Sequence, residues 1–409
     1  MAAGLIVQKY GGSSLSSPEQ IQAIAERIAA RARDANRIIV AVSAMGSSTD
    51  ELLRLAYRIT PQPPRRELDM LLSVGERTSM ALLSMALNSI GCKAISFTGS
   101  QCGIVTSVSH TRALIQEIRG DRIEEALSQG QVVIVAGFQG VSRTKEITTL
   151  GRGGSDTTAV ALAARLDASA CEIYTDVPGV FTADPRIVKN ATGLPRINYD
   201  EMLELAVLGA KVLHYRAAEL ARRYRVPLHL LSSFDDSGGT VVRSSGDKVE
   251  YEQISSITSK TDVALVRVIA KSHDVGIPQL MRRIVENDIQ LTNYHCASGT
   301  EETTVTVVVE RENLDTLLGI ISALPTDGLR TETHDDVASV SIVGSGIACS
   351  ARTISEVERV LTDAKIPVYD VGTSSLSVTC IVPEPARKHA VEILHMRFIE
   401  KGRIRSKQR

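Results

Sequence analysis

The chain has 409 residues, which at about 150 residues per domain predicts two or three domains. Hydrophobic residues make up 43% and charged residues 23%, as in folded soluble proteins, so a wholly disordered chain is excluded. The formal net charge of -1 excludes a general electrostatic attraction for nucleic acid. Aromatic residues are only 3% and tryptophan is absent, which argues against a surface on which bases stack.

The sequence also argues against secretion and membrane insertion. The N-terminal residues lack the basic and apolar regions of a signal peptide, and the longest apolar runs are far too short to cross a bilayer. The six cysteines are widely spaced without a C-x-x-C pair, which is typical of reduced thiols in a cytoplasmic protein. The eight histidines show no metal-ligand spacing, so we expect no metal site built by the protein alone.

Strand-like and helix-like patterns alternate through the first half of the chain. Apolar runs predict strands at residues 5–9, 37–42, 132–136, 171–175 and 226–231. Amphipathic patterns predict helices at residues 17–33, from 50 onward, and at 67–90, 155–166 and 199–224. This alternation predicts an α/β fold, in which helices cover both faces of a mainly parallel sheet.

The second half of the chain contains an internal repeat. A turn-rich stretch near residues 240–255 ends the first domain, which we place at residues 1–245. Strand–helix–strand–strand–helix patterns then begin at Val263 and again at Val337. Each copy matches a ferredoxin-like βαββαβ module, and we place the two at residues 255–330 and 331–400. Tandem modules without a titratable cluster favour ligand sensing over a purely structural docking role.

Three glycine-rich turns each follow a predicted strand and open a helix, at residues 9–14, 43–49 and 151–156. Such turns place backbone N–H groups and a helix N-terminus at the carboxyl edge of the sheet, where α/β proteins bind ligands. Together with Lys9 and Arg152, they predict a site for a polyanion. Their spacing matches neither the P-loop nor the dinucleotide-binding fingerprint.

Three further features allow two interpretations each. Lys9 ends a buried strand, where it is either directed at a ligand or a solubilising charge on an edge strand. Lys211 is predicted to lie in the middle of a helix, where a solvated lysine is the alternative. The loop at 175–186 combines Asp176 and Asp184 with glycine, proline and arginine, as a nucleotide-holding loop does, and an ordinary Asp-Pro turn is the alternative.

Six motifs occur in the same order as in one known family. They lie at residues 9–13, 43–46, 75–77, 151–157, 175–186 and 209–214. Their combination resembles the aspartate kinases of the amino-acid kinase superfamily, and the resemblance covers essentially the whole chain. The tandem repeat is similar to the paired ACT modules of that family. The resemblance therefore implies a three-layer α/β/α kinase sandwich followed by two ferredoxin-like ACT modules.

The resemblance also implies a reaction. It is the ATP-dependent phosphorylation of the L-aspartate side-chain carboxylate to 4-phospho-L-aspartate, the first step toward lysine, threonine and methionine, with ATP and Mg²⁺ as cofactors. A free aspartate side chain has a pKa near 3.9 and is already an ionised nucleophile at neutral pH, so we expect no general base. A kinase for another amino acid, such as glutamate, and a non-catalytic amino-acid sensor on the same fold stay open as alternatives.

The motifs imply a role for individual residues. Catalytic roles fall on Lys9, Arg152 and Asp156, with Asp156 organising lysine or magnesium near the reacting atoms. The implied ATP site consists of Lys9, Tyr10, Gly11, Gly12, Ser43, Tyr174, Thr175, Asp176, Val180, Phe181, Thr182, Ala183, Asp184, Pro185, Arg186 and Lys211. The implied aspartate site consists of Thr49, Glu76, Arg152, Gly153, Gly154 and Ser155. Arg152 suits the α-carboxylate because its planar fork can bind both oxygens, and Glu76 suits the α-ammonium group.

The implied partners are L-aspartate, a small amino-acid effector at the ACT modules, and a second copy of the chain in a homodimer or higher homo-oligomer. Neither nucleic acid nor a membrane is expected. The loop at 272–279 and the stretch at 372–376 depart from the usual pattern of the ACT modules. We therefore expect retained dimerisation and weak feedback by lysine and threonine.

Overall fold

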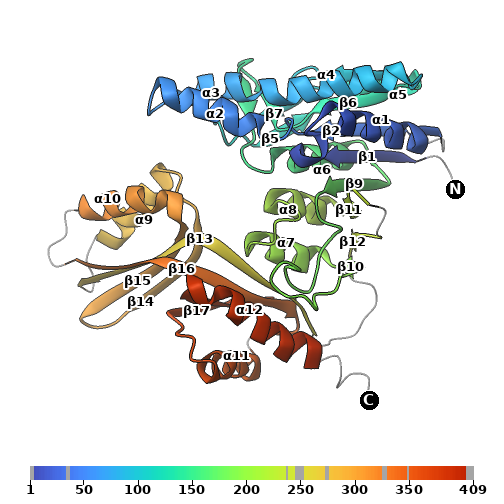
Figure 1. Cartoon of the computed structure of the whole chain (residues 1–409). Coiled ribbons are helices and arrows are strands. Elements are labelled where there is room, and N and C mark those ends of the chain that lie inside the picture. Colours follow the sequence, from blue (N-terminus) through green and yellow to red (C-terminus); the bar gives the residue numbers. More distant parts are fainter. Residues whose placement is uncertain are drawn as a thin grey trace. The chain divides into compact units, whose positions relative to one another are not determined.

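The computed structural model describes residues 4–33, 37–235, 238–244, 253–271, 276–324, 329–347 and 350–401. Contacts among these residues divide the chain into two compact units (Figure 1). The N-terminal unit comprises Met1–Val180, Gly193–Ala206 and Lys211–Asp247, and the C-terminal unit comprises Phe181–Thr192, Val207–Ala210 and Lys248–Arg409. The limits given above for three domains stay a prediction.

An eight-stranded sheet, as far as the described residues show, forms the centre of the N-terminal unit. Its order is β10-β12-β11-β9-β1-β2-β6-β3, and neighbouring strands are parallel except for the β11–β12 pair. The strands are β1 (Leu5–Tyr10), β2 (Arg37–Val42), β3 (Ala94–Phe97), β6 (Val132–Ala136), β9 (Ala170–Thr175), β10 (Arg196–Ile197), β11 (Leu228–Ser232) and β12 (Thr240–Val242). The central strands are almost wholly apolar and buried, as expected when helices cover both faces.

Helices pack on both faces of this sheet (Figure 1). On one face, α1 (Pro18–Arg33) and α4 (Val74–Ser89) bury Ile24, Ile28 and Leu83 against the strands. The opposite face carries α6 (Gly154–Arg165) and α8 (Tyr215–Tyr224). The remaining helices of the unit are α2 (Ser48–Ile59), α3 (Arg65–Leu72), α5 (Asp121–Ser128) and α7 (Tyr199–Val207). The predicted α/β/α sandwich is confirmed.

A second, four-stranded sheet in the described part of this unit has the order β5-β4-β7-β8. Its strands are β4 (Ile104–Thr106), β5 (Ile115–Ile118), β7 (Gln139–Ser142) and β8 (Ile147–Thr149). The sequence patterns do not predict this sheet, because strands of three or four residues are too short to show a period.

Two long helices predicted from the sequence are each broken in the structure. Residues 67–90 fall in α3 and α4, which are separated at Ser73. Residues 199–224 form α7 and α8, which are separated by a loop in which Gly209 has a φ of +112° and His214 is extended. The prediction that Lys211 lies in the middle of a helix is therefore wrong, since Lys211 lies in this loop.

The C-terminal unit is built on a six-stranded antiparallel sheet, within the residues described, of order β14-β15-β13-β16-β18-β17. Its strands are β13 (Gln253–Lys271), β14 (Leu291–Ser298), β15 (Glu302–Glu310), β16 (Arg330–Ser345), β17 (Asp370–Thr373) and β18 (Ser377–Pro383). Its helices are α9 (Gly276–Glu286), α10 (Leu314–Ser322), α11 (Ala351–Asp363) and α12 (Arg387–His395). The order of elements confirms the ferredoxin-like repeat.

Strands β13 and β16 run through both copies of the repeat. Residues 263–271 of β13 pair with β15 of the first copy, whereas residues 253–260 pair with the second half of β16. Residues 337–343 of β16 pair in turn with β18 of the second copy. Each copy thus contributes a strand to the other, and continuous backbone pairing joins the two.

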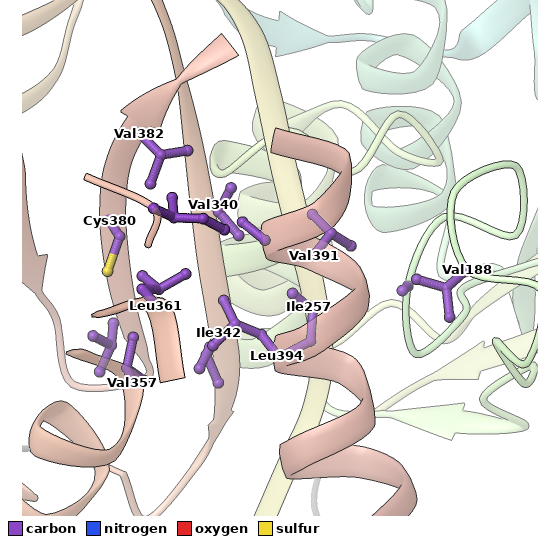
Figure 2. Close-up of a cluster of buried hydrophobic side chains, with 14 of the residues drawn as sticks. Val188, Ile257, Val340, Ile342, Val357, Leu361, Cys380, Val382, Val391 and Leu394 are labelled. Atoms are coloured by element: carbon purple, nitrogen blue, oxygen red, sulfur yellow. The ribbon is translucent and has the colours of Figure 1, made fainter. Parts of the chain in front are cut away.

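The second copy has a hydrophobic core that includes a segment from earlier in the chain. Figure 2 shows Ile257, Val340 and Leu394 among the side chains of this cluster. Ala183 and Val188 belong to the same cluster, and the backbone N–H of Ile257 donates to the carbonyl of Thr182 at 2.8 Å. Residues 181–192 are therefore a structural part of the C-terminal unit. In the described part of the chain, no helix is both long and apolar enough to span a membrane.

Candidate active site

Lys9 and Asp156 form an ion pair at the carboxyl edge of the large sheet. Lys9 lies near the end of β1, and its Nζ is 2.8 Å from Oδ1 of Asp156 in the first turn of α6. Each side chain is only 12% exposed. Side chains alternate along a strand, so Gln8 and Tyr10 face the opposite, buried side of β1. Lys9 is therefore directed to the α6 side, and the edge-strand interpretation does not apply, because β1 lies between β9 and β2.

Asp156 is also held by His214. The backbone N–H of His214 donates to Oδ2 of Asp156 at 3.2 Å, and the His214 side chain caps α8 by accepting from the N–H of Arg216. The imidazole ring lies against Gly153, where an added Cβ would be 2.0 Å from Cγ of His214. Gly153 also has a φ of +66°, so both its conformation and its surroundings require glycine. No role for His214 is predicted from the sequence, although this residue ends the sixth motif.

The first two glycine turns pack against each other beside Lys9. The N–H of Gly46 donates to the carbonyl of Gly12 at 3.0 Å, and a Cβ on Gly12 would lie 2.8 Å from the carbonyl oxygen of Ala44. A Cβ on Gly11 would lie 3.4 Å from Nζ of Lys9. A ligand that approaches Lys9 along Gly11 therefore meets main chain rather than a side chain.

Glu76, in the first turn of α4, presents an unusual carboxylate. Its Oε1 accepts from the N–H of Ala44 at 3.2 Å, and its Oε2 is buried without a hydrogen-bond partner among the described residues. Burial raises the pKa of Glu76 to about 7. Buried polar atoms are rarely left unpaired, so this oxygen favours a ligand that supplies a donor.

The third glycine turn opens α6 close to the ends of two strands. A Cβ on Gly137, which follows β6, would lie 2.9 Å from both Oγ of Ser155 and the carbonyl oxygen of Val42. Ser155 is therefore at the carboxyl ends of β2 and β6, as predicted. Arg152 is exposed on the turn between Gly151 and Gly153. Thr49 lies near Gly75, since its Oγ1 is 3.9 Å from the position of a Cβ on that glycine.

Tyr10 and Tyr174 lie away from Lys9, in the core under α1. Their rings stack with centroids 4.6 Å apart, and Tyr10 is fully buried. On the same side, Glu172 accepts from Nε2 of Gln8 at 2.8 Å and from the hydroxyl of Tyr174 at 3.1 Å. The pKa of Tyr174 is raised, mainly because the side chain is buried and also because the negative charge of Glu172 lies nearby. A contact between Tyr10 and ATP would have to come from its backbone.

The fifth motif is divided between the two units. Tyr174, Thr175, Asp176 and Val180 lie in the N-terminal unit, and Phe181, Thr182, Ala183, Asp184, Pro185 and Arg186 lie in the C-terminal unit. The hydroxyl of Thr182 is hydrogen-bonded to Nε2 of His395 at 2.9 Å, and the side chain of Ala183 is buried in the hydrophobic cluster. Arg186 pairs with Asp184 at 2.8 Å and lowers the pKa of that carboxyl. These side chains are engaged within the C-terminal unit, and their part in an ATP site stays a prediction.

Two other residues of the predicted ATP site lie on loops of the N-terminal unit. Ser43 follows β2, and its N–H donates to the carbonyl of Tyr10 at 3.1 Å. Lys211 is exposed on the loop that ends at His214. Over the ranges that the structure describes, no group of three or more His, Cys, Asp or Glu side chains could hold a metal ion.

Known proteins resemble this chain over almost its full length. Residues 4–232 match the model of the amino acid kinase family. The chain is 44% identical over 407 residues to the aspartokinase of Mycolicibacterium smegmatis, and the match covers 96% of each chain. It is also 44% identical over 400 residues to the aspartokinase of Geobacillus stearothermophilus, with 97% of each chain covered.

The chain belongs to the aspartokinase family. The crystal structure of Escherichia coli aspartokinase III in complex with aspartate and ADP matches it with a TM-score of 0.81 at 25% identity, over 96% of this chain and 99% of that chain. The chain is thus an enzyme that phosphorylates aspartate with ATP, the first step of the aspartate pathway. The two alternatives left open by the sequence are thereby excluded.

Proposed function

We propose that phosphoryl transfer takes place at the Lys9–Asp156 pair, with ATP along the first glycine turn and L-aspartate between Glu76 and Arg152. The observation that carries this proposal is the 2.8 Å contact between Lys9 and Asp156 at the edge where the three glycine turns begin. Open α/β sheets bind their ligands at this edge, and helix N-termini there favour anions.

Phosphoryl transfer needs positioning and charge neutralisation more than covalent help from the protein. The attacking carboxylate of aspartate is already ionised at neutral pH, so no residue has to remove a proton from it. Lys9 supplies positive charge to the phosphate oxygens, where charge develops in the transition state. Asp156 keeps the ammonium group of Lys9 in place, and the N–H of His214 keeps Asp156 in place.

Aspartate recognition rests on two charged residues and the start of α6. Arg152 binds the α-carboxylate through both oxygens, and the unpaired Oε2 of Glu76 accepts from the α-ammonium group. The backbone of Gly153 and Gly154, together with Ser155, lies at the N-terminus of α6, where a carboxylate is stabilised by the helix dipole. Thr49 adds a hydroxyl beside Gly75.

The nucleotide site draws on backbone groups more than on side chains. Its members are Lys9, Tyr10, Gly11, Gly12, Ser43, Tyr174, Thr175, Asp176, Val180, Phe181, Thr182, Ala183, Asp184, Pro185, Arg186 and Lys211. Magnesium fits this arrangement, because Mg²⁺ keeps several waters and needs one or two carboxylates besides the substrate phosphates. Asp156 is the carboxylate that would hold it. The bound ion would neutralise phosphate charge.

A trapping experiment tests the proposal. Purified protein is incubated with ATP, Mg²⁺, hydroxylamine and either L-aspartate or L-glutamate, and acyl hydroxamate is measured. We expect hydroxamate from aspartate only, its loss in the Lys9→Ala variant, and a lower yield at low aspartate concentration in the Arg152→Lys variant, in which the charge is kept and the two-pronged geometry is lost. Full activity in both folded variants would overturn the proposed roles of Lys9 and Arg152.

We also propose that the C-terminal unit binds a small amino-acid effector and joins two copies of the chain in the cytoplasm. Strands β14 and β17 lie at the two edges of its sheet, and open edges favour pairing with another chain.

The expectation of weak feedback rests partly on the loop at 272–279, of which residues 272–275 lie outside the described residues. Sedimentation of the intact protein tests the assembly, and titration of activity with lysine and threonine tests the expected weak feedback.

A further inference from the structure

Asp69, in α3, is a fully buried carboxylate that the proposed reaction does not use. Its Oδ1 accepts from the hydroxyl of Thr149 at 2.5 Å, and both oxygens accept from the N–H of Thr111 at 3.0 and 3.2 Å. Its Oδ2 is 2.6 Å from Nδ1 of His110. A buried carboxylate is costly unless its oxygens are hydrogen-bonded, so Asp69 ties these neighbours firmly to α3.

The residues that Asp69 holds lead directly into the turn that carries Arg152. Thr149 is the last residue of β8, just before this turn. A Cβ on Gly151 would lie 2.9 Å from the carbonyl oxygen of Thr111, so the Thr111 segment contacts the turn itself. The two segments are also joined to each other, because the N–H of Ala113 donates to the carbonyl of Thr149 at 2.9 Å.

Arg216, on α8, binds the same two segments through the carbonyls of Leu150 and Ala113. Its Nη1 donates to the carbonyl of Leu150 at 2.5 Å, and its Nη2 donates to the carbonyl of Ala113 at 3.0 Å. The buried carboxylate of Asp69 and the half-buried guanidinium group of Arg216 therefore hold the two segments that lead into the Arg152 turn. Charge-assisted hydrogen bonds of this kind are stronger than neutral ones.

The backbone of Thr111 has an unusual conformation, which indicates that tertiary contacts hold this segment in place. Its φ is +68°, in the left-handed region that a β-branched residue rarely adopts. Such a backbone persists only when its surroundings impose it, and it is concentrated at functional sites. The N–H of Thr111 donates to both oxygens of Asp69, so this carboxylate is one of the groups that hold the backbone at this residue.

We infer that Asp69 is a positioning residue for aspartate binding, which acts by fixing the direction of Arg152. This inference rests on the proposed role of Arg152 at the α-carboxylate. A two-pronged contact depends on orientation as well as charge, so a small displacement of the turn weakens it. Asp69 itself touches neither substrate in this assignment.

The test uses two matched substitutions on one strand. Thr149→Val removes a donor to Asp69, and Thr148→Val removes the adjacent buried hydroxyl, which instead bonds Oγ1 of Thr106 at 2.5 Å. For Thr149→Val we expect the KM for aspartate to rise about tenfold, as for the loss of a hydrogen bond to a charged group, with the KM for ATP and kcat within about twofold. For Thr148→Val we expect both KM values within about twofold of wild type.

A double-mutant cycle shows whether the effect passes through Arg152. In an Arg152→Lys background, Thr149→Val should raise the KM for aspartate no further. Additive effects, an equal rise in the KM for ATP, or an equal effect of Thr148→Val would overturn the inference. If Thr149→Val does not fold, His110→Ala gives the same readout, because that side chain is partly exposed.

The outcomes also separate this inference from the proposed function. If Arg152→Lys raises the KM for aspartate and the folded Thr149→Val and His110→Ala variants do not, the inference fails and the role of Arg152 stands. If Arg152→Lys leaves the KM for aspartate unchanged, the proposed role of Arg152 fails, and the inference fails with it.

Discussion

Nζ of Lys9 lies 2.8 Å from Oδ1 of Asp156, and both side chains are largely withdrawn from water. The contact joins the carboxyl end of β1 to the first turn of α6. A charge in such a pair depends on its partner, because removing one leaves the other desolvated and unpaired. The pair thus fixes the position of the lysine that we assign to the phosphates.

Replacing Lys9 by alanine should therefore abolish most of the turnover while the fold is retained. Removal of one electrostatic contact to the transition state costs roughly 100- to 1000-fold in kcat. The exposed Lys93, in the same unit, provides the control, and Lys93→Ala should keep kcat within about twofold. Steady-state kinetics and circular dichroism decide the matter. A folded Lys9→Ala variant with more than about a tenth of wild-type turnover would contradict the assignment.

The raised pKa of Glu76 predicts a pH dependence of aspartate binding. Only the ionised carboxylate can pair with the α-ammonium group, and burial places the pKa at about 7. For a single ionisation at that value, the KM for aspartate should be about tenfold higher at pH 6 than at pH 8. The KM for ATP should change far less. In Glu76→Gln the KM for aspartate should be high at both pH values, and a pH profile that survives this substitution would exclude Glu76 as its source.

The same group predicts how stability depends on pH without substrate. A pKa raised from 4.5 to about 7 means that the folded protein binds a proton that the unfolded chain releases between these values. The contribution of Glu76 to the free energy of unfolding is therefore fully present below pH 4.5 and is lost as the pH rises through 7. The size of this contribution is about 3 kcal/mol. The free energy of unfolding of wild type and Glu76→Gln can be measured in urea at pH 5.5 and pH 8. Relative to wild type, Glu76→Gln should be more stable at pH 8 than at pH 5.5. An equal difference at both pH values would be evidence against the raised pKa.

Much of this site could be predicted because its signals are local. The strands before the first two glycine turns are apolar runs, and β1, β2, β6, β9 and β11 lie close to where such runs predict them. Glycine in such a turn marks a close approach of other atoms to the main chain, which the structure shows for backbone atoms at Gly12 and for the His214 side chain at Gly153. Lys9 and Asp156 each belong to one of these turns, so their meeting follows from the parallel sheet.

What the sequence does not reveal depends on contacts between distant segments. No local pattern links Asp69 to Thr111 and Thr149, because these residues meet only when α3 packs beside β8. The helix break before His214 is hidden because helical periodicity continues through the loop. Likewise, only the folded C-terminal unit shows that Thr182 faces His395 within that unit.

The buried network around Glu172 should be important for stability rather than for turnover. Glu172 accepts from Gln8 and Tyr174 and pairs with Arg31 at 2.9 Å. Glu172→Ala leaves the buried amide of Gln8 without its acceptor, and the loss of hydrogen bonds to a charge should cost about 3 kcal/mol in the free energy of unfolding. Glu26→Ala, at an exposed position of α1, should change it by less than about 0.5 kcal/mol. Equal urea midpoints for the two variants would show that the network contributes nothing.

Alanine substitutions at two glycines with similar backbone conformation can distinguish the effect of backbone strain from the effect of a steric clash. Gly153 and Gly130 have φ values of +66° and +72°, so alanine at either position carries a similar left-handed penalty of about 1–2 kcal/mol. Around Gly130 an added Cβ meets nothing within 4 Å, whereas at Gly153 it would lie 2.0 Å from Cγ and 2.2 Å from Cβ of His214.

Gly153→Ala must therefore displace His214, whose N–H holds Oδ2 of Asp156. We expect kcat to fall at least about tenfold in Gly153→Ala, the loss of roughly one hydrogen bond to a charge, and to stay within about twofold in Gly130→Ala. Thermal unfolding should show the larger loss of stability in Gly153→Ala. If both variants lose stability equally and keep full turnover, then the contact between Gly153 and His214 does not position Asp156. If only Gly153→Ala loses turnover, the hydrogen bond from the N–H of His214 to Asp156 is needed for the reaction. The loop that carries Lys211 and ends at His214 would then contribute to positioning the reacting groups.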